Sequence, residues 1–200
     1  MASFAGISAA GKSLERLLTA CFTEEQPVPG KQTRALLVRT EDFAQSNGAL
    51  SFTLPALTLY LYRVDFNKTT RAAWSGVGHL DGRGHLPLDL HFLLTAWADN
   101  AEYEYRIIGK TMQCLETTPI LNGPLLYPDP TADWAPNEAI QLVLEEISTE
   151  AVMRTFDSLP TDYKLSIPYI ARVIRLDSRV SYASPTVTSV TSGIKPSSSP

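Results

Sequence analysis

The chain has 200 residues, of which 44% are hydrophobic and 19% are charged, and this composition suits one domain with a sizeable buried core. Its formal net charge of −4 argues against a protein whose main task is to neutralise nucleic-acid phosphates or to lie on anionic lipid. No stretch approaches the roughly 18 consecutive apolar residues that a membrane span requires. We therefore expect a protein that is made and kept in the cytoplasm unless a larger assembly carries it elsewhere.

The first element is a predicted amphipathic helix over residues 7–22. Apolar residues recur there at helical spacing, and Lys12, Glu15 and Arg16 lie mostly off the apolar stripe, where a signal peptide would need an unbroken apolar core. Ser8 is its expected N-cap, and the loop with Pro27 ends it.

Three strands are predicted next, over residues 33–40, 56–65 and 86–98, with residues 41–55 as a loop. In the second strand Leu57, Leu59 and Leu61 share one face. Both faces of the third strand are apolar, which is typical of a central strand covered on both sides. Residues 67–83 between them are polar and glycine-rich, and a loop of this length is usually functional or disordered.

A second helix is predicted over residues 101–117, with Asp99 and Glu102 at the spacing of a capping box. Its expected buried stripe comprises Ala101, Tyr105, Ile108, Met112 and Leu115. Residues 119–130 contain four prolines and a glycine, and these predict an extended loop.

The last predicted elements are a strand over residues 139–147, a helix over 148–159 capped by Ser148 or Thr149, and a strand over 165–176. Pro168 cannot donate to a ladder, so we expect the last strand at a sheet edge or at a bulge. Residues 179–200 are rich in Ser, Thr and Pro and are expected to be a disordered tail after a domain of residues 1–178. The fold class is therefore α/β or α+β, a single domain with a mixed sheet flanked by helices.

The two cysteines, Cys21 and Cys114, both fall on or beside helical apolar stripes. The favoured interpretation is a pair of small buried hydrophobic residues in a reducing compartment. A disulfide between them and a reactive thiol are the alternatives.

The sequence offers little chemistry. His79, His85 and His91 are six residues apart, which suits neither a helix face nor a loop clamp, so no metal site is predicted. The glycine-bearing stretches lack the arrangement of a phosphate-binding loop. Glu145 and Glu146 are adjacent on a predicted strand and face opposite sides, one solvated and the other at an interface. We expect no catalytic residue, cofactor or metal.

Long strings of the chain resemble a known family. LYLYRVDFNKTTRAAW at residues 59–74, together with residues 85–121 and 134–178, is similar to the N-terminal domain of cap proteins from extracellular contractile injection systems. These are phage-tail-like particles of the antifeeding-prophage and virulence-cassette type, and ISAAGKSLERLL at the start of the chain also matches. The resemblance covers residues 8–178, and longer family members continue into a further domain.

The resemblance implies a tail terminator that forms a sixfold ring on the last layer of inner tube and sheath. The implied partners are copies of itself, the tube protein and the sheath protein, with neither nucleic acid nor membrane insertion. The implied location is the bacterial cytoplasm, followed by assembly into a particle that is released or anchored. The candidate tube or ring contact is the loop that carries Lys68, Arg71, Trp74 and Arg83.

The last tube and sheath layer would leave strand edges unpaired, and an edge strand of the cap could pair with them. Our candidates are residues 165–176, with Val173 and Ile174, or residues 33–40. The alternatives to the cap role are a neck or adaptor subunit of the same particle and, from a different class, a small ligand-binding or enzymatic α/β domain.

Overall fold

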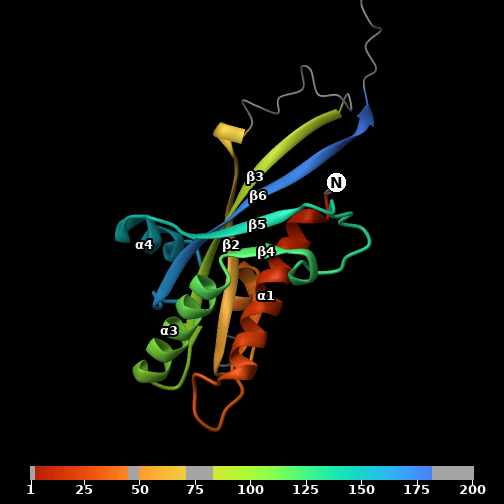
Figure 1. The fold of residues 1–200 in the computed structure, drawn as a ribbon. Helices are drawn as coiled ribbons and strands as arrows, with labels where there is room; N and C mark the ends of the chain where they lie inside the picture. Colours follow the sequence, from red (N-terminus) through yellow and green to blue (C-terminus); the bar gives the residue numbers. More distant parts are fainter. Residues whose placement is uncertain (1–2, 45–49, 71–82, 182–200) are drawn as a thin grey trace, which may run out of the picture.

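The computed structural model describes residues 3–44, 50–70 and 83–181. Its strands are β1 (Arg34–Val38), β2 (Ala56–Phe66), β3 (Arg83–Trp97), β4 (Ile120–Asn122), β5 (Ala139–Leu144) and β6 (Ser166–Ser181). They form one six-stranded sheet in the order β1-β2-β3-β6-β5-β4 (Figure 1). The β1–β2 pair is parallel and the other pairs are antiparallel, so the predicted mixed sheet in an α/β domain is confirmed.

The helices are α1 (Gly6–Glu24), α3 (Ala101–Thr117) and α4 (Thr149–Asp157), with short 3-10 turns at η1 (Thr40–Phe43) and η2 (Gly123–Leu125). Helices α1 and α3 share the main core on one face of the sheet. Helix α4 and η1 enclose a smaller core on the other face, around Phe43, Trp97 and Phe156. The sheet is therefore the middle of three layers.

Helix α1 covers the predicted residues, and its apolar stripe follows from their spacing. Ala10, Leu14, Leu18 and Phe22 recur four residues apart and are buried against the sheet. The prediction that Ser8 caps this helix is wrong. Ala5 occupies the N-cap position, and the Ser8 hydroxyl donates to the Ala5 carbonyl from within the first turn, at 2.9 Å.

Strand β3 pairs with β2 on one side and with β6 on the other, so it is a central strand. This confirms the prediction made from its two apolar faces. The predicted alternation in β2 also holds, since Leu57 and Leu59 enter the main core while Tyr60 packs against the smaller one. The region expected to be a plain loop after β1 contains η1, whose Phe43 is fully buried.

Helix α3 has the predicted end points, and Ile108 and Leu115 of its predicted stripe are buried, but its cap and the rest of the stripe differ from the prediction. Asn100 is the N-cap and accepts the Tyr103 amide at 2.9 Å, while Asp99 pairs with Lys31. Tyr105 is 63% exposed, and Ala101 and Met112 are also exposed. The buried residues are Ile107, Ile108, Thr111, Cys114 and Leu115. Helical periodicity allows several adjacent stripes, and the angle at which α3 meets the sheet selects one of them.

Cys21 and Cys114 form a disulfide that joins α1 to α3, so the favoured interpretation of two separate thiols is wrong. The two residues are 93 positions apart in the sequence. Helices α1 and α3 lie on the same face of the sheet, which brings the two Cα atoms to 6.3 Å, within the range that a disulfide spans.

The segment predicted as an extended loop contains β4 and η2, and β4 adds a short edge to the sheet beside β5. Helix α4 begins at the predicted cap, where the Ser148 hydroxyl accepts the Ala151 amide at 3.2 Å. Strand β5 ends three residues earlier than expected, at Leu144. Strand β6 continues to Ser181, past the expected domain limit at residue 178, and residues 182–200 lie outside the described ranges.

Candidate assembly surfaces

Strands β3 and β6 continue beyond the helices as a projecting arm (Figure 1). The register of β2 with β3 ends at Phe66 and Leu88, whereas β3 and β6 remain paired as far as Arg83 and Ser181. Large apolar side chains remain exposed on the arm at Leu86 of β3 and Val180 of β6, and beside its base at Val64 and Phe66 of β2. Exposed apolar side chains grouped in this way are typical of a surface that another protein covers.

The predicted contact loop starts beside the base of this arm and ends on its β3 strand. Lys68 lies in a helical turn directly after β2, where the Asn67 side chain accepts the Thr70 amide at 2.8 Å. Arg83 is the first residue of β3. The structure therefore brings both ends of the loop to one end of the sheet. Arg71 and Trp74 lie outside the described residues.

Strand β1 is one edge of the sheet, but its outer side is occupied. The Leu37 amide donates to the Glu15 carboxylate at 3.0 Å, and the Ala35 amide donates to the Thr19 hydroxyl at 3.3 Å. Both acceptors come from α1, which follows this edge. Side chains that bond to edge amides block pairing with another chain, so residues 33–40 are a poor strand-pairing edge.

Strand β6 is an inner strand over its first part, between β3 and β5, so its expected position at the sheet edge is wrong there. The Pro168 carbonyl accepts the Glu145 amide at 3.0 Å, so the main chain of Pro168 faces the β5 side, and its missing N–H costs no bond to β3. The pairing of β6 with β5 ends at Arg172. The pairing of β6 with β3 has an irregularity next to this point, between Ala171 and Ile174. Val173 therefore lies where β6 leaves β5, with no register partner among the described residues.

Ile174 differs from its neighbour, because it pairs with Leu88 of β3 and its side chain is fully buried in the main core. Of the two residues proposed for strand pairing, Val173 therefore has no register partner in the described sheet, and Ile174 is part of the core.

A polar cluster on the α4 side of the sheet connects three strands. The Glu145 side chain is only 7% exposed and accepts hydrogen bonds from the Tyr62 hydroxyl at 2.7 Å and Arg63 at 2.8 Å. Nδ1 of His91 lies 2.9 Å from the same carboxylate. Burial tends to raise the pKa of Glu145, but the bonds from His91 and Tyr62 and the Arg63 charge outweigh it and hold that pKa below 4.5.

Burial, followed by the bond to Glu145, raises the pKa of the Tyr62 phenol, so this donor stays protonated at neutral pH. The side chains of the cluster satisfy one another, which makes it a cross-link between β2, β3 and the end of β5. Sequence reasoning missed it because the partners are 54 to 83 residues apart. Glu146, the next residue after Glu145, is exposed, as predicted for two adjacent residues that face opposite sides.

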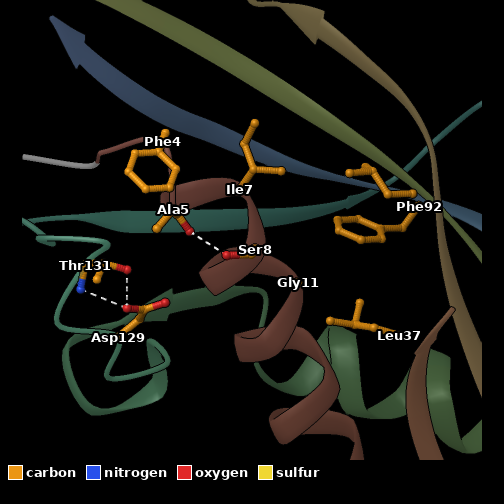
Figure 2. Close-up of a pocket in the computed structure, with 10 residues that line it drawn as sticks. Phe4, Ala5, Ile7, Ser8, Gly11, Leu37, Phe92, Asp129 and Thr131 are labelled. Atoms are coloured by element: carbon orange, nitrogen blue, oxygen red, sulfur yellow. Dashed lines mark hydrogen bonds between the residues drawn. The ribbon is translucent and has the colours of Figure 1, made fainter. Parts of the chain in front are cut away.

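An apolar cavity of about 560 Å³ lies where the start of α1 crosses the sheet (Figure 2). Its lining includes Phe4, Ile7 and Gly11 from the N-terminal region and Leu37 and Phe92 from the strands. A Cβ atom at Gly11 would lie 3.1 Å from Leu37, so glycine permits the close approach of α1 to β1. The cavity could hold apolar side chains of a partner.

Other chemistry is sparse in the described ranges. No group of three His, Cys, Asp or Glu side chains there could hold a metal ion. No helix in this part of the chain is long and apolar enough to cross a bilayer.

Residues 10–189 match the family model described as the Pvc16 N-terminal domain. The chain belongs to this family. A search of curated proteins found no match to this chain.

Two solved structures share its fold. One is described as a sheath/tube terminator of an extracellular contractile injection system, PVC, in the extended state, with 17% identity, a TM-score of 0.57 and 96% of this chain covered. The other is an anti-feeding prophage cap, described as a tube terminating cap, with 14% identity, a TM-score of 0.54 and 92% of this chain covered. This Pvc16 N-terminal domain chain spans 64% and 60% of the lengths of those two chains.

Proposed function

We propose that this chain is a structural, non-enzymatic cap that closes into a sixfold ring on the last tube and sheath layer of a contractile injection system. The observation that carries the proposal is the match of residues 10–189 to the Pvc16 N-terminal domain family. The shared fold with a sheath/tube terminator and with a tube terminating cap supports it. The protein would be made in the bacterial cytoplasm and carried from there in the assembled particle.

Ring closure explains how such a subunit stops growth. A helical tube has heterologous contacts that do not close, so its end always presents a surface for another subunit. A subunit that fits this surface, closes on copies of itself and offers no copy of the surface on its outer side ends the polymer.

The tube contact of this proposal is the arm formed by β3 and β6, with the loop that leaves it. The arm exposes apolar side chains, and Lys68 and Arg83 at the ends of the loop are basic although the whole chain is acidic. A basic patch of this kind can dock on an acidic tube rim. Reversing charge with Lys68→Glu and Arg71→Glu should reduce the fraction of capped particles, and unchanged capping would reject this contact.

The sheath contact of this proposal is the edge of β6 that starts at Val173. Val173→Pro removes an amide without a register partner in the described sheet, so the fold should remain intact while sheath pairing is lost. Val173→Ala keeps the amide and is the matched control. Equal sheath attachment by both variants would rule out this edge.

The cap role itself is tested by particle length. Particles assembled without this subunit should have a broad length distribution in electron micrographs, and adding back the wild-type chain should restore a uniform length. The mass of the purified ring should equal six subunits. An unchanged length distribution after deletion, or location of the subunit at the neck, would contradict the proposal.

A further inference from the structure

The outer side of strand β5 is open at Leu144, beyond the end of β4. Leu142 donates its amide to the Pro119 carbonyl on the β4 side at 2.8 Å, whereas Glu145 donates to Pro168 on the β6 side at 3.0 Å. Main-chain groups of successive residues in an extended strand point to alternate sides, so the N–H and C=O of Leu144 point to the β4 side. Within the described ranges, no strand covers β5 there.

Two grooves flank this open edge, one on each face of the sheet, and Leu144 lines both. The groove on the α3 side has a volume of about 610 Å³ and is lined by Met112 and Leu115 of α3 and by Tyr169. The groove on the α4 side has about 370 Å³ and is lined by residues that include Val152 and Tyr163. The edge of β5 is therefore the floor of a slot with a helix on either side.

Both walls of the slot carry accessible apolar side chains beside polar ones. Met112 is 37% exposed, and Leu144 and Tyr163 are each 47% exposed. An ordinary edge strand has one polar face, whereas a strand in this slot would meet apolar side chains on each face, from Met112 on one side and from Tyr163 on the other. The open main-chain groups require an extended partner, because only a strand presents donors and acceptors at the matching spacing.

The rim of the slot is acidic, which adds a charge requirement. Glu116 on α3 and Glu146 just after β5 are exposed beside the grooves that they line. A basic side chain at the end of an incoming strand complements them. The Ser-, Thr- and Pro-rich residues 182–200 of this chain are too polar to fill two apolar walls.

The geometry points to a strand-receiving slot at the end of β5 that binds an extended segment of another protein, apolar on both faces and followed by a lysine or arginine. The segment extends the sheet next to Leu144 between α3 and α4. This slot is a separate surface from the arm and from the β6 edge, and it does not depend on the cap role.

The test uses the full chain and a fluorescent synthetic peptide, Lys-Val-Ile-Thr-Val-Val-Lys, in an anisotropy titration. The same peptide with every internal main-chain amide N-methylated cannot donate main-chain hydrogen bonds to the edge and should not bind. Binding of the unmodified peptide should protect the Leu144 amide from hydrogen exchange while the Glu145 amide, already bonded to Pro168, changes little. No binding, or protection elsewhere, would overturn the assignment.

Variants separate the main-chain contact from the walls. Leu144→Pro removes the outward amide together with the leucine side chain and should weaken peptide binding at least about tenfold, whereas Leu144→Ala removes the side chain but keeps the amide and should weaken it by about threefold or less. Met112→Glu and Tyr163→Glu test the walls at exposed positions that leave folding intact, and each should weaken binding. Glu146→Lys should shift preference toward a glutamate-flanked peptide.

Equal binding by wild type and Leu144→Pro, with both folded by circular dichroism, would refute the slot. Tighter binding of a peptide from residues 183–196 than of the lysine-flanked peptide would also refute the partner, because the occupant would then be this chain or a second copy.

Discussion

Reduction of the Cys21–Cys114 disulfide should cost as much stability as the most damaging single truncation in the core. The bond links residues 93 positions apart, and the cross-link restricts the unfolded chain over that whole loop. The chain-entropy relation gives about 4.7 kcal/mol at 25 °C for a loop of roughly this length. For a domain of this size such a loss corresponds to a Tm lowered by roughly 10–19 °C.

The assay is urea unfolding of wild-type protein, with and without a phosphine reductant, followed by circular dichroism. The control is the double variant Cys21→Ala with Cys114→Ala, which should unfold identically with and without reductant. Its stability should be close to that of reduced wild type, less a small cost for the volume lost at the buried Cys114. A change below about 1 kcal/mol on reduction would refute the cross-link as a stabilising element.

Three further outcomes are expected. Glu145→Gln removes a buried charged acceptor and should lower the free energy of unfolding by about 1–3 kcal/mol at neutral pH. Because folding lowers the pKa of Glu145, its contribution to the free energy of unfolding is present above the ordinary carboxyl pKa and is lost as the pH falls through the folded-state pKa. Acid titration should therefore bring the stabilities of wild type and variant together. A stability difference that stays constant with pH would contradict this. Asn100→Ala should cost about 1 kcal/mol in thermal unfolding whereas Asp99→Ala costs less, and the reverse order would place the α3 cap one residue earlier. Leu14→Ala should cost about 2–5 kcal/mol in chemical unfolding, compared with near-neutral effects of Ala at the exposed Tyr105.

Local pattern determined most of the elements. Helical spacing located α1 and α3 within a few residues, and apolar residues on both faces marked β3 as central, because burial imposes the period of the element on the sequence. The family also followed from the sequence, because long matching strings are far more specific than composition.

Tertiary structure alone decided what depends on distant neighbours. It brought Cys21 to Cys114, made Ile107 rather than Tyr105 face the core, and placed most of β6 inside the sheet although Pro168 favours an edge. It also assembled the Glu145 cluster and left β5 open at Leu144 between two helices. Periodicity within one element fixes which residues share a face, but which neighbour meets that face follows only from how all the elements pack.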